Sequence, residues 1–417
     1  MVNESKQKQR IFSKYEVFVI AVLTFLQFTI VLDFMVLSPL GAQLLDELNI
    51  TTSQFGWVVS AYAFSAGTSG LLTAGFADKF DRKKLLLFFY TGFIGGTLLC
   101  ALAPDYHSLL VARIVTGLFG GVIGSISFAI ITDIFRMEVR GRVMGFVQMA
   151  FATTQVLGIP IGLFLANRLG WHSPFYMIVV LGVLVGIAIV IHFRPIDAHL
   201  KIQSDRSPFQ HLIKTMSHSM YVRAFAATTL LATGGYMMMP FGSAFGIHNL
   251  GISFDDLPML YLITGLCSMI TGPFIGKLSD TIGKYAIFFA GTLLSMFIVV
   301  IYCNLGLTPL WLVIVMNVVM FVGISSRIIS SSALMTAVPE PMDRGAFMSI
   351  NASVQQISGG IASVVAGMIV VQTDTGKILH YDTLGYVVVG AMIITVIMMY
   401  FINEQVMRKT TVIAGVK

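Results

Sequence analysis

The chain has 417 residues, of which 56% are hydrophobic and 11% are charged. Soluble proteins carry roughly 25% charged residues, so this composition excludes an ordinary soluble domain. The net charge of +6 would suit a nucleic-acid-binding protein, but the basic residues gather beside long apolar segments. Their positions therefore indicate membrane topology, and we expect no nucleic-acid partner.

Long apolar segments recur along the whole chain. A bilayer core about 30 Å thick needs roughly 20 residues of helix to cross it. The sequence predicts an all-α membrane protein with twelve spans, near residues 16–40, 56–76, 84–103, 108–131, 143–166, 174–193, 221–247, 258–278, 284–304, 309–332, 345–370 and 383–403.

Basic residues are concentrated in every second loop. They precede the first span and follow the second, fourth and sixth, whereas the loops between hold Arg168, Lys377 and several acids. Since Lys and Arg are retained on the cytoplasmic side, this pattern predicts a multi-pass protein with both termini in the cytoplasm. We expect the lipid bilayer of a bacterial inner membrane.

A short charged loop occurs in both halves of the chain. Residues 74–83 (AGFADKFDRK), after the second span, are repeated approximately by 276–285 (GKLSDTIGKY), after the eighth. Duplication of a six-helix unit explains the repeat, and such transporters bind substrate between the two units. We predict a first bundle over 1–193, a cytoplasmic linker over 194–219 and a second bundle over 220–417.

Asp33 is the one carboxylate well inside a predicted span. Charged groups at such depth usually face a cavity or a partner. Desolvation favours the protonated form of a carboxyl group and a nearby cation favours the ionised form, so Asp33 is a candidate for proton or substrate binding. Arg113 lies at a similar depth and could pair with it. The alternative is that Asp33 only fixes the first span to a neighbour.

Polar and flexible side chains inside other spans are candidates for the same cavity. Tyr62 is one of the polar positions. Tyr236 precedes Met237-Met238-Met239, and flexible thioethers suit a site for varied apolar ligands. Methionine is also an ordinary core residue, so core packing is the alternative.

The repeated loop offers a gate on the cytoplasmic side. Asp78 stands at the end of the second span, and Arg82 could reach Asp133 at the end of the fourth. Asp280 is the corresponding acid of the second copy. A solvated loop that only sets topology is the alternative.

Two further features lie within spans. Gly158, Pro160 and Gly162 interrupt the fifth span, which predicts a kink or close packing at the interface between the bundles. Arg327, near the cytoplasmic end of the tenth predicted span, is expected to extend its long side chain to the membrane surface.

The chain has no metal-ligand spacing of histidines, no phosphate-binding loop and no nucleophile–base arrangement. We therefore predict that it is not an enzyme, that it holds no metal or other cofactor, and that a proton gradient supplies its energy.

These motifs resemble those of the major facilitator superfamily. Residues 74–83 are similar to the family's motif A, with Asp78 and Arg82 at its charged positions, although Ala74 and Asp81 replace glycines and are expected to loosen the turn. Arg113 is similar to the motif B arginine, which the family associates with proton coupling. Residues 158–162 resemble a shortened motif C of antiporters, and Asp33 resembles the acid of the first span in twelve-span drug:proton antiporters and arabinose-efflux-permease-like exporters.

The resemblance implies a monomeric, proton-coupled exporter of small amphipathic or drug-like molecules that works by alternating access. A sugar or nucleoside exporter and a proton-coupled importer are alternatives of the same class. A membrane receptor without transport is an alternative of another class.

Overall fold

Helices form almost the entire structure, a computed structural model that describes residues 12–73, 79–197, 200, 208–340 and 343–415. We call its first set of helices the first bundle. It consists of α1 (Lys14–Val36), α2 (Gly41–Glu47), α3 (Thr52–Thr73), α4 (Arg82–Ala101), α5 (Tyr106–Ile134), α6 (Met137–Thr153), a π-helical turn (Thr154–Gly158), α7 (Ile159–Leu169) and α8 (Ser173–His192).

The second bundle follows α9 (Pro208–Met216). It includes a short antiparallel hairpin in which Val371 pairs with Leu379, a small departure from the expected all-α fold. Its elements are α10 (Ser219–Tyr236), a 3-10 turn (Met239–Phe241), α11 (Gly242–His248), α12 (Leu257–Ile282), α13 (Lys284–Cys303), α14 (Leu310–Ala337), α15 (Arg344–Ile369), β1 (Val371–Gln372), β2 (Ile378–Leu379) and α16 (Tyr381–Gly415).

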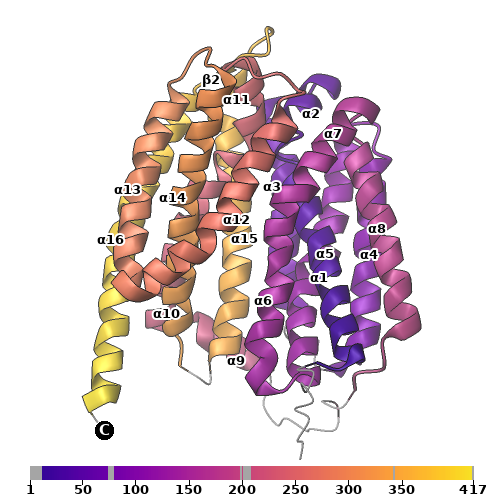
Figure 1. Cartoon of the computed structure of the whole chain (residues 1–417), viewed down its shortest axis with the longest axis vertical. Coiled ribbons are helices and arrows are strands. Elements are labelled where there is room, and N and C mark those ends of the chain that lie inside the picture. The colour runs from indigo at the N-terminus through magenta and orange to yellow at the C-terminus, as the bar shows by residue number, and fades with distance from the viewer. Residues whose placement is uncertain (1–11, 74–78, 198–199, 201–207, 341–342, 416–417) are drawn as a thin grey trace, which may run out of the picture.

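The helices stand side by side along the long axis of the molecule (Figure 1). The C-terminus and α9 lie at one end, which we call the linker end. The short elements α2, α11 and β2 lie at the other, the hairpin end. The domain boundaries predicted from the sequence, at 193–194 and 219–220, stay a prediction.

Ten of the described helices are long and apolar enough to cross a bilayer, with α6, the π-helical turn and α7 counted as one. The two remaining predicted spans correspond to α3 and to α10 with α11. The predicted all-α membrane fold is therefore confirmed.

Helix α3 is less apolar because small polar residues on it face α15 of the second bundle. Ser60 Oγ donates to the carbonyl of Gly360 at 2.7 Å, and Thr52 Oγ1 donates to the carbonyl of Val370 at 2.6 Å. A β-carbon at Gly56 would lie 2.7 Å from the Ser363 carbonyl oxygen. Small residues allow membrane helices to approach this closely, and here they join the two bundles.

Further contacts join the bundles at the hairpin end. Ser243 Oγ of α11 donates to the carbonyl of Ser38 at 3.0 Å. Asn167 Nδ2 of α7 donates to the carbonyl of Phe254 at 2.6 Å. The hairpin end is therefore closed in this conformation.

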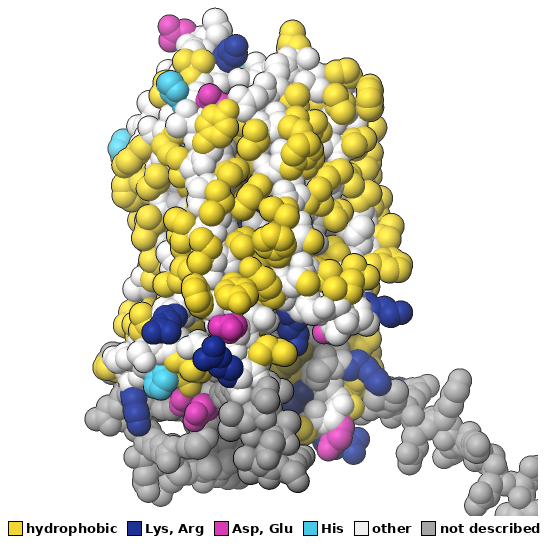
Figure 2. Space-filling model, turned by 90° about the vertical axis from the view of Figure 1, so that its left-hand side faces the viewer, with side chains coloured by type: hydrophobic (Ala, Val, Ile, Leu, Met, Phe, Trp, Pro, Cys, Tyr) yellow, Lys and Arg dark blue, Asp and Glu magenta, His cyan; other side chains and the backbone are white. Residues whose placement is uncertain are grey.

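Apolar side chains cover the face of the molecule shown in Figure 2, and the dark blue Lys and Arg side chains gather mainly at its lower end. On α8, for example, Leu184, Val190 and Ile191 are each more than half exposed. An apolar belt of this kind between polar ends fits a lipid bilayer, and the fold is that of a multi-pass membrane protein.

Candidate functional site

Asp33 and Arg113 form an ion pair inside the first bundle. Asp33 lies in the last turn of α1 and Arg113 in the second turn of α5, and Arg113 Nη1 is 2.8 Å from Asp33 Oδ2. The side chains are 0% and 1% exposed. Thr97 of α4 donates from Oγ1 to Asp33 Oδ1 at 3.1 Å. Three helices thus converge on one carboxylate near the hairpin end.

The charges of Asp33 and Arg113 balance each other out of contact with water. Breaking a buried pair leaves an uncompensated charge, which is strongly unfavourable. Protonation of Asp33 would remove the counter-ion of Arg113, whose Nε already has no hydrogen-bond partner. Protonation would therefore leave the buried guanidinium without a charged acceptor for its N–H groups.

Aromatic side chains connect this pair to the second bundle. The guanidinium carbon of Arg113 lies 4.6 Å from the centre of the Tyr62 ring. Phe34 contacts Tyr62 on one side and Tyr236 of α10 on the other, with ring centres 5.4 and 6.0 Å apart. The Tyr236 hydroxyl donates to Gln356 Oε1 of α15 at 3.4 Å. The four residues predicted for proton or substrate binding thus belong to one cluster.

Glycines of α5 make room for Tyr62. A β-carbon at Gly117 would lie 2.5 Å from the Tyr62 carbonyl oxygen, and one at Gly120 would lie 2.9 Å from the Tyr62 hydroxyl. Larger residues at either position would push α3 away from α5. The local sequence of α5 therefore sets the distance between Tyr62 and Arg113.

The predicted contact between Arg82 and Asp133 is present at the linker end. Arg82 Nε donates to Asp133 Oδ2 at 3.2 Å, and the two side chains are 7% and 21% exposed. The contact joins α4 to α5 within the first bundle, so it does not itself bridge the bundles. Asp78 lies outside the described residues.

Asp81 holds the start of α4, contrary to the expectation that an aspartate here loosens the turn. Its carboxylate accepts hydrogen bonds from the backbone N–H of Lys84 and of Ile196, each at 2.9 Å. Lys83 Nζ donates to the carbonyl of Phe193 at 2.6 Å. An aspartate before a helix caps the exposed N–H groups of its first turn, which a glycine cannot do with a side chain.

Replacing Asp81 with alanine should lower the stability of the protein by about 0.5–2 kcal/mol, the usual cost of losing such a cap. Unfolding of the purified protein in detergent measures this change. Asp374→Ala, at an exposed position in the hairpin, is the control and should unfold like the parent. Equal midpoints for all three proteins would contradict the capping role.

The second copy of the loop makes a different contact. Asp280 is exposed near the end of α12. Its neighbour Ser279 accepts a hydrogen bond from Ser330 of α14, with the two oxygens 3.2 Å apart. Beside the first copy, a charge pair joins α4 to α5. Beside the second copy, a hydrogen bond between two hydroxyl groups joins α12 to α14.

The interruption of the fifth span takes the form of the π-helical turn that ends at Gly158. A β-carbon at Gly158 would lie 2.8 Å from Leu32, and one at Gly162 would lie 3.2 Å from Val36. Both glycines thus face α1 of their own bundle, whereas the turn just before them contacts the second bundle, where a β-carbon at Gly265 of α12 would lie 2.8 Å from the Gln155 carbonyl oxygen. Pro160 follows this turn directly within the continuous span, where its missing N–H removes one helical hydrogen bond.

Arg327 does not reach the membrane surface as expected. It is 4% exposed and points toward α10, where a β-carbon at Gly234 would lie 3.3 Å from its Nη2. The tenth span was predicted to end at residue 332, whereas α14 continues to Ala337. Arg327 therefore lies deeper than the sequence indicated.

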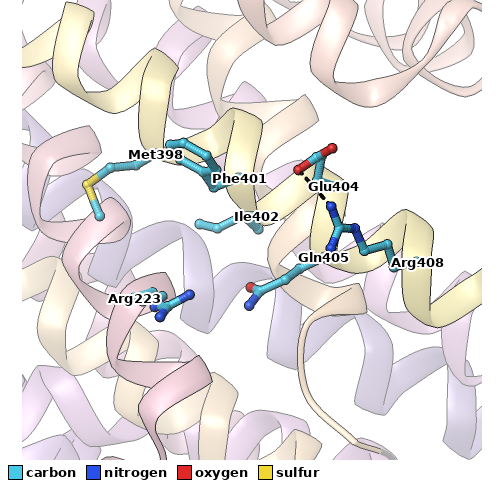
Figure 3. A pocket seen from close by; sticks show the side chains of 7 residues that line it. All are labelled: Arg223, Met398, Phe401, Ile402, Glu404, Gln405 and Arg408. Atoms are coloured by element: carbon cyan, nitrogen blue, oxygen red, sulfur yellow. Dashed lines mark ion pairs between the residues drawn. The ribbon is translucent and has the colours of Figure 1, made fainter.

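A surface groove lies along the C-terminal part of α16 (Figure 3). Met398, Phe401 and Ile402 supply its apolar wall. Arg408 lies 3.5 Å from Glu404 there, and both are exposed. The groove shares no residue with the Asp33 cluster.

Sequence reasoning missed two members of that cluster. Thr97 has the appearance of an ordinary span residue, and only its contact with Asp33 gives it a role. Phe34 follows Asp33 directly, but it is one of 32 phenylalanines in the chain, and nothing in the sequence distinguishes it from the others. The described residues contain no group of three His, Cys, Asp or Glu that could hold a metal ion.

Comparison with known proteins gives consistent matches. The family model described as Major Facilitator Superfamily matches residues 23–248 and 224–412. The uncharacterized MFS-type transporter YceJ of Bacillus subtilis (strain 168) is 28% identical over 271 residues, which are 64% of this chain and 68% of that protein. Multidrug resistance protein 3 of the same organism is 30% identical over 152 residues, 36% of this chain and 30% of that protein.

The structure of the nucleoside transporter NupG superposes with a TM-score of 0.72 at 13% identity, covering 92% of this chain and 98% of that one.

Proposed function

Because the chain belongs to the Major Facilitator Superfamily, we propose that it is a proton-coupled exporter of small amphipathic molecules. The observation that carries this proposal is the fully buried pair of Asp33 and Arg113, whose neighbours Tyr62 and Phe34 lead to Tyr236 of the second bundle. A protonatable group that is linked to the second bundle through neighbouring aromatic rings can couple its charge to the relative position of the bundles.

The proposed cycle alternates two states of Asp33. When the site opens to the outside, Asp33 takes up a proton and releases Arg113. When it opens to the cytoplasm, the proton leaves, Arg113 pairs with Asp33 again, and substrate enters. Shifting a two-state balance from 1:99 to 99:1 needs about 5.5 kcal/mol of differential binding. Loss of one partner of a buried ion pair costs about 3–5 kcal/mol, so breaking and re-forming this pair would supply most of that difference.

We further propose that the linker end faces the cytoplasm. Arg136, Arg140 and Arg142 follow α5 there, whereas the described residues at the hairpin end include only Arg168 and Lys377 as Lys or Arg. This asymmetry fits retention of basic residues on the inner side of a bacterial inner membrane. Arg82 and Asp133 would then form part of a cytoplasmic gate, together with Asp78 and Asp280.

Export of drug-like compounds draws support from the partial match to multidrug resistance protein 3. The proton gradient is the proposed energy source, with no cofactor, and the monomer is the proposed unit of transport.

The test uses everted membrane vesicles whose interior is acidified by respiration. Addition of an exported compound should release protons from vesicles that contain the protein, and a pH-sensitive dye reports this release. A panel of amphipathic anions, cations and neutral compounds identifies the substrates. If no compound releases protons, or if vesicles without the protein respond equally, the proposed function is wrong.

A further inference from the structure

The second bundle contains a charged group that the proposed mechanism does not use. Arg327 is ten residues from the end of α14 at Ala337 and seventeen from its start at Leu310. At about 1.5 Å per residue, it lies roughly 15 Å from the nearer end of the helix. Its side chain is 4% exposed, so it does not extend to the headgroups at the membrane surface.

The guanidinium of Arg327 lies between helices of its own bundle. A β-carbon at Gly234 of α10 would be 3.3 Å from Nη2, 3.5 Å from Nη1 and 3.8 Å from the methyl carbon of Met392 on α16. The absence of a side chain at Gly234 thus lets the two terminal nitrogens lie close to α10. The methyl group of Met392 adds an apolar contact on this side.

Among the residues that the structure describes, Arg327 has no partner for its charge. Its Nε and Nη2 are buried and make no hydrogen bond, and none of the described acidic residues forms an ion pair with it. Asp33, whose carboxylate lies deep within α1, is already paired with Arg113. Arg113 and Arg327 therefore differ, because Arg113 pairs with an internal carboxylate and Arg327 pairs with none of the described acidic residues.

An unpaired guanidinium in a desolvated site favours an anion from outside the chain. Its planar arrangement of N–H donors matches the two oxygens of a carboxylate, which it can hold with parallel hydrogen bonds. The apolar Met392 beside it suits a hydrocarbon body. Together these features fit an amphipathic carboxylate.

We propose that Arg327 binds the carboxylate group of the transported molecule, so that the substrates are organic anions with an apolar body. This inference rests on the proposed transport function, and it names the substrate class. Asp33 responds to the proton in the first bundle, and Arg327 holds the anion in the second. A bound anion would also supply the missing counter-ion.

The test measures binding without any proton gradient. Thermal unfolding of the purified full chain in detergent is followed with 1-naphthoate, with the uncharged 1-naphthamide, and with sodium chloride at equal ionic strength. Naphthoate should raise the unfolding midpoint of the parent protein, since a ligand that binds only the folded state stabilises it. Naphthamide and chloride should not.

Variants then assign the effect to Arg327. Arg327→Gln should lose the response to naphthoate and bind it about tenfold more weakly or worse, because a charged hydrogen bond is lost. Arg327→Lys keeps the charge without the planar group and should retain part of the response. Arg408→Gln, at an exposed arginine of the same bundle, should respond like the parent.

The proposal is overturned if naphthoate stabilises the parent and Arg327→Gln equally. It is also overturned if naphthoate and naphthamide act equally on the parent, or if naphthoate has no effect on the parent. Arg327→Gln should itself fold, since it removes an unpaired buried charge; if it does not, the comparison of Arg327→Lys with the parent decides. Failure of proton coupling in vesicles would leave these binding results unchanged, so the two proposals fail separately.

Discussion

Asp33→Asn is expected to reduce substrate-dependent proton release to the level of vesicles without the protein. Asparagine keeps the size of the side chain and can still accept from Thr97, but it cannot gain or lose the proton. It also leaves Arg113 without its counter-ion. Loss of one partner from a buried pair costs about 3–5 kcal/mol of stability, so the variant should also unfold more easily.

Two further proteins separate coupling from folding. Asp33→Asn combined with Arg113→Gln removes both charges and should recover much of the lost stability, yet it should remain uncoupled. Asp374→Asn changes an exposed acid of the hairpin and should behave like the parent. Proton release by the Asp33→Asn variant at the parent rate would show that another group carries the proton.

Arg82→Asp is expected to slow export about tenfold with little change in substrate affinity. The pair of Arg82 and Asp133 is largely buried, so its loss should exceed the 0–1 kcal/mol typical of surface pairs. A change of about 1.4 kcal/mol alters an equilibrium tenfold. The pair lies at the linker end of the first bundle, whereas the Asp33 cluster lies near the hairpin end and Arg327 lies in the second bundle, so binding should be preserved. Initial rates of export in vesicles and binding in detergent measure the two quantities.

A charge exchange provides the control for this pair. Asp133→Arg alone should be as slow as Arg82→Asp, because each places like charges together. The double variant restores opposite charges and should recover most of the export rate. If the double variant stays as slow as the single ones, the contact with Asp133 is not what Arg82 contributes to turnover.

The sequence was a good guide where a property depends on position along the chain. Runs of apolar residues located the spans, most of them within a few residues. The depth of Asp33 and Arg113 was estimated by counting residues from the ends of their helices, and two buried opposite charges at one depth have a strong reason to meet. Their pairing at 2.8 Å follows from that physics.

Properties that depend on the direction of a side chain around its helix were predicted less well. Gly158 and Gly162 face α1 and not the other bundle, and one sequence does not give the rotation of α7. For Arg327, an error of five residues in the end of α14 changed a residue near the surface into one deep inside. The cap that Asp81 forms with Lys84 follows a local rule, but its second partner, Ile196, lies 115 residues away and no local rule identifies it.

The contact between α3 and α15 also bears on how easily the two bundles can separate. Ser60 Oγ lies 2.7 Å from the Gly360 carbonyl across the interface and 2.6 Å from the carbonyl of Gly56 in its own helix. A hydroxyl group has one hydrogen to donate, so when the helices part it can give that hydrogen to Gly56 and leave no donor unsatisfied. The hydrogen bond from Ser60 to Gly360 across the interface can thus be replaced by the hydrogen bond from Ser60 to Gly56 within α3. Such an exchange keeps the energy barrier between open and closed states low.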